Sequence, residues 1–408
     1  MTARPSFRKS VVWARRIGVC TFALAATALA DGSGGGSLGL PAFSNEVEGA
    51  LVRALTGLRE QGLTQALLEV DKMLARNPNY KLGHLIRGDL LMARAGQPVA
   101  FASTAATVAN VAPLQDEARV RMKRYLEAPR VDYLPAPLLQ LAPDQAHALL
   151  IDTSRSRLFV YANDLGRPRY VTDFYISLGK NGVEKTREGD QKTPIGIYTI
   201  VSQKEKLPDF YGPGAYPLSY PNEWDRINGR NGHGIWLHGT PSDTYSRAPW
   251  ATDGCVVLTN EDLARLSKYV DVSRTPVVID QSVEWHAPGQ WESERETFLK
   301  AFGTWKNDWE SLDTGKYLSH YSRNFRSTRR DYAAWSASKR KVNAGKTWIK
   351  VEANDMSVFA YPGTPNLMMI TFEQVYRSNN LSTRTVKRQY WEREAGQWRI
   401  VHEAVLTS

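Results

Sequence analysis

The stretch HGTPSDTYSRAPWATDGCVVLTN, residues 238–260, places a histidine 17 residues before a cysteine and then runs into apolar residues. His238 ends the segment GIWLH and precedes Gly239, a pattern that predicts a short strand whose last side chain faces a cleft. Cys255 lies between Gly254 and the apolar run VVL. A thiol in this position is compatible with a buried structural residue, half of a disulfide, a metal ligand or a nucleophile.

The first 30 residues have the pattern of an export signal. Five Arg or Lys residues and no acid precede the apolar run at 17–30, which ends in the small-residue sequence Ala28-Leu29-Ala30. An uncleaved N-terminal anchor is the alternative, although this run is shorter than the roughly 20 residues that span a membrane. Cleavage would remove Cys20 and lower the formal net charge from +10 to +5, leaving Cys255 as the single thiol. Without a second cysteine, no internal disulfide can form.

Composition and periodicity predict a multidomain protein. The 408 residues are 42% hydrophobic and 23% charged, which is typical of soluble globular chains. We expect the following parts in chain order: a signal peptide at 1–30, a linker at 31–44, an α-helical region at 45–130, a mainly β domain at 145–282, a second linker at 284–292 and an α+β domain at 293–408.

The helical region contains two amphipathic segments around a turn at Asn77-Pro78-Asn79. It resembles one tetratricopeptide unit, and a plain helical hairpin is the alternative. A single unit of this kind cannot bury its own apolar face, so we expect it to pack against another part of the chain.

The neighbours of Cys255 favour the nucleophile. A thiol reacts as its thiolate, and the imidazole of His238 is the group in this stretch that can take the proton. Gly254 allows a close backbone approach and can leave N–H groups free for an oxyanion. A zinc site is disfavoured because no second cysteine would remain after signal cleavage and the remaining histidines are scattered along the chain.

The stretch 238–260 resembles the His-Gly and Gly-Cys signature of YkuD-type L,D-transpeptidases. The segment GDQKTPIGIYTI, residues 189–200, resembles the second signature of that family. The resemblance covers 145–282, about a third of the chain. The pattern of 293–408 resembles the cone-shaped SnoaL-type, nuclear-transport-factor-like fold. The whole architecture is similar to a Gram-negative subgroup that includes L,D-carboxypeptidases, which trim peptidoglycan stems and help set cell shape.

This resemblance implies a role for each residue of the signature. Cys255 would be the nucleophile, His238 the general base, and the carbonyl of Gly239 the group that orients the histidine. The N–H groups of Gly254 and Cys255 would form the oxyanion hole. Asp253 departs from the His or Arg of many relatives, so it would either meet a substrate amine or pair with a nearby cation. The family uses no metal or cofactor.

Four further residues are candidate substrate contacts. Trp236 shares the strand face of His238 and is either core or a wall of the cleft. His233 lies five residues before His238, and on a strand this odd offset points the two side chains to opposite faces. His233 is therefore either a loop histidine or a substrate contact. The segment 203–232 is rich in Gly, Pro and Tyr and is predicted to be a long lid-like loop. Its Tyr211 and Tyr216 would line the donor site or pack the loop on itself.

The segment 316–350 contains ten Lys or Arg residues and one acid, Asp331. This charge predicts either attraction to an anionic envelope polymer or a solvated helix and loop. Nucleic acid is an implausible partner for an exported protein. The C-terminal domain is interpreted as a binding module or a homodimer interface.

These observations predict a periplasmic peptidoglycan L,D-transpeptidase. Cys255 would attack the carbonyl of residue three of a stem tetrapeptide, D-alanine would leave, and an amine of a second stem would resolve the thioester. Resolution by water would make the protein an L,D-carboxypeptidase instead. A non-catalytic wall-binding protein is the rival from another class.

Overall fold

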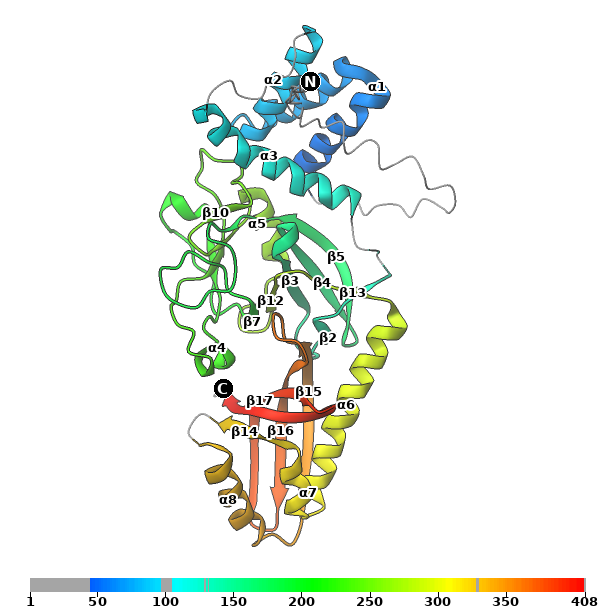
Figure 1. Ribbon diagram of the computed structural model, residues 1–408, viewed down its shortest axis with the longest axis vertical. Helices are drawn as coiled ribbons and strands as arrows, with labels where there is room; N and C mark the ends of the chain where they lie inside the picture. The colour runs from blue at the N-terminus through cyan, green and yellow to red at the C-terminus, as the bar shows by residue number, and fades with distance from the viewer. Residues whose placement is uncertain (1–44, 97–104, 128–129, 131, 328–329, 407–408) are drawn as a thin grey trace, which may run out of the picture. The chain divides into compact units, whose positions relative to one another are not determined.

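The computed structural model describes residues 45–408 except 97–104, 128–129, 131, 328–329 and 407–408. The predicted signal peptide and the whole first linker lie outside the described residues. Within the described ranges, no helix combines the length and the apolar character needed to cross a membrane. Three parts follow one another along the chain, an all-helical part, a β-rich part and an α+β part, which confirms the predicted fold class (Figure 1).

The helical region consists of α1 (Glu46–Arg76), α2 (Lys81–Arg94) and α3 (Ala105–Leu126). The predicted turn at 77–79 separates α1 from α2. Asn45 caps α1 by accepting from the Val47 N–H at 2.8 Å. The apolar faces of α1 and α2 form one buried cluster, and Tyr245 from the β-rich domain packs against it. As expected for a single helical unit, this region buries part of its surface against the next domain.

The β-rich domain is built on a five-stranded sheet in the order β5-β4-β3-β12-β7. Strands β3 and β12 are parallel neighbours at its centre. The strand bounds are β3 (His147–Asp152), β4 (Arg157–Asp164), β5 (Arg167–Tyr175), β7 (Gly196–Thr199) and β12 (Pro276–Asp280). Their alternating buried residues form the core of this domain together with β9 and β11.

Two smaller sheets of the same domain carry the ends of the signature at 238–260. One has the order β11-β9-β8 and the other pairs β6 with β10. The bounds are β6 (Leu178–Gly179), β8 (Ala215–Pro217), β9 (Trp236–His238), β10 (Trp250–Thr252) and β11 (Val256–Val257). Helix α5 (Asn260–Leu266) follows β11, with Thr259 as its N-cap.

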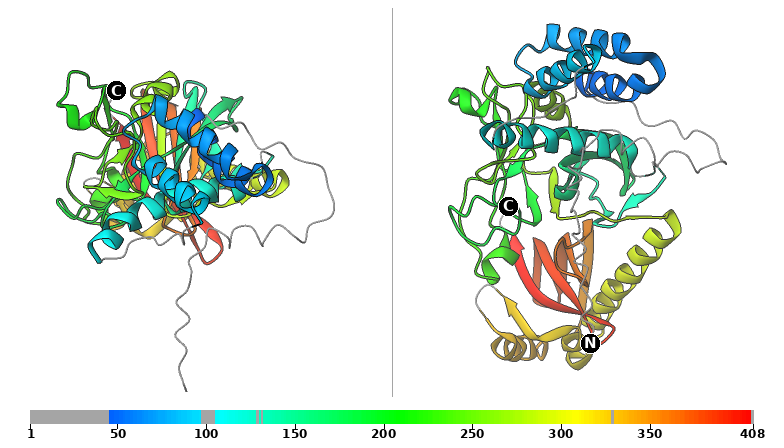
Figure 2. Two further views of the ribbon diagram at one scale, coloured as in Figure 1. Left: turned by 90° about the horizontal axis from the view of Figure 1, so that it is seen from above. Right: turned by 45° about the horizontal axis from the view of Figure 1, so that its top comes forward.

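The C-terminal domain is a six-stranded sheet in the order β14-β18-β17-β16-β15-β2, crossed by a long helix (Figure 2). The helices are α6 (Pro288–Glu310), α7 (Thr314–Ser319) and α8 (Tyr332–Asn343). The strands are β14 (Tyr321–Ser327), β15 (Ile349–Ala360), β16 (Leu367–Ser378), β17 (Leu381–Glu394) and β18 (Gln397–Leu406). The edge strand β2 (Leu138–Gln140) comes from before the β-rich domain and pairs with β15.

The sheet of the β-rich domain and the C-terminal sheet share one buried hydrophobic cluster. Leu150 and Phe159 come from the first sheet, and Phe359 and Met369 from the second. Trp224 of α4 (Glu223–Ile227) also stacks on Tyr390 of β17, with ring centroids 5.2 Å apart. The two domains are therefore packed as one body rather than joined by a flexible tether.

Two details of the sequence prediction are wrong. The segment 284–292 is not a linker, because β13 (Trp285–His286) pairs with β1 (Leu134–Pro135) and α6 begins at Pro288. The segment 203–232 is not one long loop, because it contains η3 (Asp209–Tyr211), β8 and α4. Short strands such as these depend on a partner strand, which local periodicity does not reveal.

Candidate active site

The pairing of β9 with β11 brings the histidine and the cysteine to the same site. The two strands are parallel, with Val256 opposite Leu237 and Val257 opposite His238. Cys255 precedes β11 by one residue and lies two residues before Val257. Because side chains alternate along a strand, Cys255 faces the same side of the sheet as His238. Two residues that are 17 apart in sequence are thus placed on the same side of one strand pair.

His238 is held in one orientation and kept neutral. Its side chain is buried, and Nδ1 lies 2.7 Å from the carbonyl oxygen of Gly239. A carbonyl can only accept a hydrogen bond, so Nδ1 carries the proton and Nε2 presents a lone pair. Burial lowers the pKa of His238 to about 4, and the nearby charge of Arg247 adds to this effect. The imidazole is therefore able to accept a proton throughout the neutral range.

The thiol of Cys255 is protonated in the resting site. Desolvation is the main cause that raises its pKa, and the charge of Asp253 acts in the same direction. The Trp236 backbone N–H and the cations Arg247 and Lys185 lower the pKa by smaller amounts. Sγ lies 3.4 Å from the carbonyl oxygen of Gly234. A neutral thiol beside a neutral imidazole requires proton transfer to occur during nucleophilic attack.

The backbone before Cys255 makes a tight turn that only glycine fits. Gly254 has φ +119°, and a Cβ there would lie 2.7 Å from the Lys192 carbonyl oxygen. The Gly254 N–H donates to Oγ1 of Thr252 at 3.1 Å. The expectation that this N–H is free for an oxyanion is therefore wrong for the resting structure. The hydroxyl of Thr252 in turn donates to the Cys255 carbonyl at 2.7 Å, which fixes the turn.

The second signature supports the turn that carries the thiol. Oγ1 of Thr193 donates to the Gly254 carbonyl at 3.1 Å. Asp190 accepts from Nζ of Lys185 at 2.7 Å and from three backbone N–H groups. Burial opposes ionisation of Asp190, but these hydrogen bonds lower its pKa to about 2. The signature at 189–200 therefore has a supporting role, holding the backbone against which Gly254 packs.

Aromatic side chains surround the histidine. The ring of Tyr211 lies 5.1 Å from the ring of His238 and 5.0 Å from that of Trp236. The ring of Phe210 lies 6.0 Å from that of His238 and is half exposed. Tyr211 and Trp236, both named from the sequence, are thus brought together at the site. Phe210 was not singled out, although it directly precedes Tyr211.

The other three predicted contact residues are engaged with other parts of the protein. Tyr216 is 5% exposed and packs in the core of the domain, so it lacks the exposure of a substrate contact. His233 is an exposed side chain whose Nε2 lies 3.2 Å from Glu188. Asp253 pairs with Nζ of Lys180 at 2.9 Å, one of the two alternatives that its charge suggested.

Sequence reasoning missed Arg247, which lies inside the quoted stretch, eight residues before Cys255. Its charge acts on the pKa of both Cys255 and His238, and its guanidinium lies over the ring of Phe210 at 4.7 Å. Arg247 is the only Lys or Arg between His238 and Cys255, which could have marked it as a candidate site residue. The local sequence pattern does not indicate the direction of its side chain.

Both signatures lie in the β-rich domain, and that domain matches a known family. Residues 146–279 match the family of L,D-transpeptidase catalytic domains, YkuD. These residues form an L,D-transpeptidase catalytic domain. Residues 297–404 match the Cds6 C-terminal NTF2-like domain family. The chain therefore combines the catalytic domain with an NTF2-like domain, as its sequence resemblance indicated.

Known proteins resemble the chain over different extents. YafK of Escherichia coli K12, named as a candidate L,D-transpeptidase, is 31% identical over 86 residues, which is 21% of this chain and 31% of that protein. The chain thus matches less than a third of this curated relative. Bd1075 of Bdellovibrio bacteriovorus is similar in structure, with a TM-score of 0.61 and 25% identity, covering 68% of this chain and 99% of that one. The helical cell shape determining protein Pgp2 of Campylobacter jejuni has a TM-score of 0.58 and 27% identity, covering 66% of this chain and 95% of that one.

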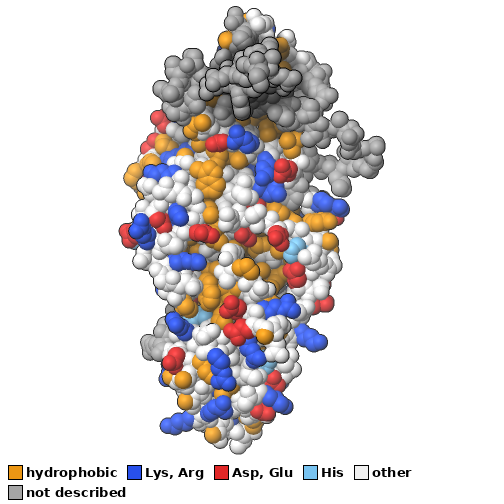
Figure 3. Space-filling view, in the orientation of Figure 1, with side chains coloured by type: hydrophobic (Ala, Val, Ile, Leu, Met, Phe, Trp, Pro, Cys, Tyr) orange, Lys and Arg blue, Asp and Glu red, His pale blue; other side chains and the backbone are white. Residues whose placement is uncertain are grey.

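The basic segment 316–350 lies in the NTF2-like domain, and much of its charge is engaged there. Lys350 lies 3.8 Å from Glu310, and Nζ of Lys346 donates to Ser378 at 3.0 Å. Nζ of Lys339 lies over the ring of Trp335 at 5.3 Å, and desolvation lowers its pKa to about 8. Figure 3 shows Lys and Arg side chains over this domain, at the lower end of the face in view, interspersed with acidic ones.

Proposed function

We propose that the protein cleaves the L,D bond between residues three and four of peptidoglycan stem tetrapeptides through a thioester on Cys255. The observation that carries this proposal is the pair of a protonated thiol and a neutral, oriented imidazole on two paired strands of an L,D-transpeptidase catalytic domain. A wall-binding protein without activity has no need for a buried histidine held in the tautomer of a general base.

The first half of the reaction forms the thioester. The proton of Sγ moves to Nε2 of His238 as the sulfur attacks the carbonyl carbon of residue three. The oxyanion that results lies at the Cys255 N–H, because the Gly254 N–H already donates to Thr252. The carbon–nitrogen bond then breaks, and the imidazolium returns the proton to the leaving amine of the D-amino acid.

We propose water as the acceptor in the second half. His238 takes a proton from water, the hydroxide attacks the thioester, and the tripeptide acid and the free thiol are released. Asp253 is the group expected to attract an amine acceptor, but its carboxylate is paired with Lys180. The likeness to a protein named for cell shape determination supports the same choice. Transfer to an amine, with a cross-linked dimer as product, is the second candidate and is favoured by the family of the domain.

Mass spectrometry of disaccharide-tetrapeptide incubated with the purified protein tests both proposals. Release of D-alanine with tripeptide as the product supports hydrolysis. A cross-linked dimer, or exchange of an added D-amino acid into position four, would replace hydrolysis by transpeptidation. An unchanged tetrapeptide would contradict the proposed function.

We also propose that the protein acts in the periplasm, and that exposed cations of 316–350 help to hold it on an anionic envelope polymer. The support is the signal-like sequence at 1–30 and the exposure of Arg326, Arg340 and Lys341. Retention on isolated cell walls should fall as salt is raised, and should fall further in the double variant Arg340→Gln, Lys341→Gln. Salt-independent retention would contradict this part of the proposal.

A further inference from the structure

The guanidinium of Arg247 is a cation without a carboxylate partner beside the reactive thiol. In the described part of the chain, no Asp or Glu oxygen lies within ion-pair distance of it. Among the described residues, the guanidinium of Arg247 lies over the face of the Phe210 ring, 4.7 Å from the ring centroid. Arg247 is also partly buried, and desolvation lowers its pKa. A partly desolvated guanidinium on an aromatic ring has its hydrogen-bond donors available for an anion.

The backbone of Arg247 is fixed from two sides. Oη of Tyr175 donates to the Arg247 carbonyl at 2.7 Å, and Arg121 of α3 lies over the Tyr175 ring at 3.9 Å. Oγ of the neighbouring Ser246 donates to Glu117 of α3 at 2.8 Å. The segment before β10 is thus held by the same helix through two independent contacts.

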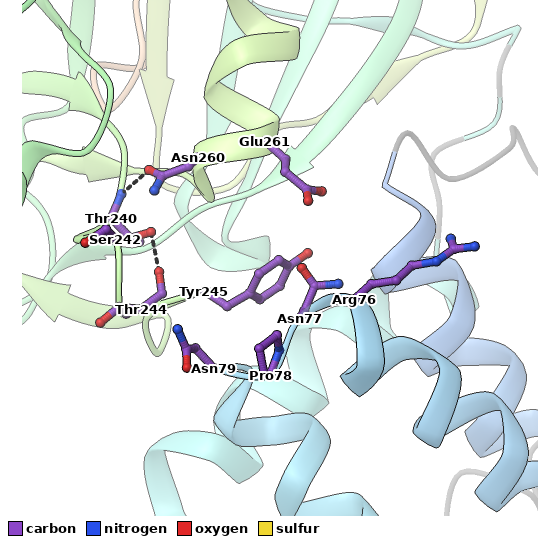
Figure 4. Close-up of a pocket in the computed structure, with 10 residues that line it drawn as sticks. All are labelled: Arg76, Asn77, Pro78, Asn79, Thr240, Ser242, Thr244, Tyr245, Asn260 and Glu261. Atoms are coloured by element: carbon purple, nitrogen blue, oxygen red, sulfur yellow. Dashed lines mark hydrogen bonds between the residues drawn. The ribbon is translucent and has the colours of Figure 1, made fainter.

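Tyr245 provides a third contact with the helical region. Its ring lies 4.7 Å from that of Tyr80, and its hydroxyl accepts from the side-chain amide of Asn45 at 3.1 Å. Figure 4 shows Tyr245 beside the turn at 77–79, on one wall of a cavity of about 220 Å³ that also includes Thr240 and Asn260. Three consecutive residues therefore have different contacts. Tyr245 and Ser246 contact the helical region, whereas the charge of Arg247 acts on Cys255.

We propose that Arg247 binds a substrate carboxylate next to the scissile bond, and that the helical region holds Arg247 in place for this purpose. The proposal rests on the proposed acyl transfer at Cys255 and adds a specificity-determining residue to it. Two carboxylates of a stem tetrapeptide have the right chemistry, that of the terminal D-amino acid and that of the side chain of residue three. Both would accept the paired hydrogen bonds that a guanidinium offers.

Competition between two small thiol reagents tests the anion site without requiring turnover. Iodoacetate carries a carboxylate and iodoacetamide is its neutral counterpart, so the ratio of their rates at Cys255 measures attraction of an anion. Arg247→Gln should lower this ratio by about tenfold, the size expected for losing a charge-assisted hydrogen bond. Arg274→Gln, at an exposed arginine outside the site, is the matched control and should leave the ratio unchanged. An unchanged ratio in Arg247→Gln would overturn the proposal even if the enzyme hydrolyses stem peptides.

Amidated substrates distinguish the two carboxylates. Wild-type protein should lose about tenfold or more in kcat/KM when the recognised carboxylate is amidated, whether that is the terminal one or the side-chain one. Arg247→Gln should lose little further on the same substrate. Equal losses in the wild type and the variant on both amidated substrates would overturn carboxylate recognition.

The role of the helical region is tested at Ser246. Ser246→Ala removes the bond to Glu117 but leaves Arg247 intact, and should lower the iodoacetate-to-iodoacetamide ratio severalfold. Ser246→Thr keeps the hydroxyl and should restore it. Thermal melts check that both variants are folded. A wild-type ratio in folded Ser246→Ala would show that the helices do not position Arg247.

Discussion

At the scale of single residues, the site works as a neutral pair rather than as a preformed ion pair. Desolvation raises the pKa of Cys255 and lowers that of His238, so both effects oppose separation of charge in the resting protein. The thiolate forms only when a substrate carbonyl is present to receive it. This protects the thiol from adventitious oxidation, because the thiolate is the form that reacts.

The nucleophile gives the first prediction at this scale. Cys255→Ala should lower the release of D-alanine by about a thousandfold or more, because Cys255 is the only cysteine in the described part of the chain. The change from one small side chain to another in a turn should leave the melting temperature within a few degrees of wild type. Substantial turnover by the folded variant would exclude the thioester.

The pH dependence gives the second prediction. The general base must be neutral to accept a proton, and burial of His238 lowers its pKa to about 4, below the usual 6.5. The acid limb of kcat/KM should therefore have its midpoint near pH 4, with activity kept at pH 5.5. His238→Ala should slow alkylation of Cys255 at neutral pH, and raising the pH should partly restore it. An acid limb near pH 6.5 would contradict the neutral-pair account.

At the scale of elements, the sequence predicted regions with a regular hydrophobic period and missed short strands that depend on a partner strand. The strands from β15 to β18 are long and alternate in hydrophobicity, and this pattern is part of what predicted an α+β domain at 293–408. The edge strand β2 has three residues and exists because β15 offers it a free edge. Pro288 was interpreted as a linker residue, whereas it stands at the first turn of α6, where proline is favoured.

The site shows the same division between local and long-range information. Cys255, His238 and the Gly239 carbonyl follow from one continuous signature. Trp236 was predicted from its strand face, and Tyr211 from the tyrosine-rich segment 203–232. Tyr216 could not be told apart from Tyr211 by composition, and only the position of β8 in the core separates them. The orientation of Arg247 depends on contacts with α3 that are more than a hundred residues away in sequence.

Trp291 gives the prediction at the element scale. Its indole N–H donates to the Leu138 carbonyl at 3.0 Å and its ring is 1% exposed, so it joins α6 to β2. Trp291→Ala should lower the free energy of unfolding by about 3–5 kcal/mol. Trp348→Ala, at a half-exposed tryptophan of the same domain, is the control and should cost much less. Equal losses in chemical denaturation would show that α6 does not anchor β2.

At the scale of the whole molecule, the catalytic and NTF2-like domains share a core, and the chain crosses between them twice. Strand β2 belongs to the C-terminal sheet although it precedes the catalytic domain, and β13 returns to pair with β1. The boundary near residue 282 therefore does not separate two independent folding units.

Truncation tests this arrangement. A chain that ends at residue 282 would expose Leu138, Leu150 and Phe159, which are buried in the shared cluster. We expect it to melt at a lower temperature than the full chain and to be cleaved faster by protease. A truncated chain that melts at the same temperature as the full chain would show that the domains are independent.

We propose that Cys255 and His238 carry out L,D cleavage of a stem tetrapeptide. The most direct test is mass spectrometry of disaccharide-tetrapeptide incubated with the full protein, with Cys255→Ala run in parallel. With the wild type we expect free D-alanine and disaccharide-tripeptide, and a thioester adduct on Cys255 when the reaction is quenched early in acid. With the variant we expect none of the three. Intact tetrapeptide with the wild type, or equal tripeptide formation by the folded variant, would contradict it.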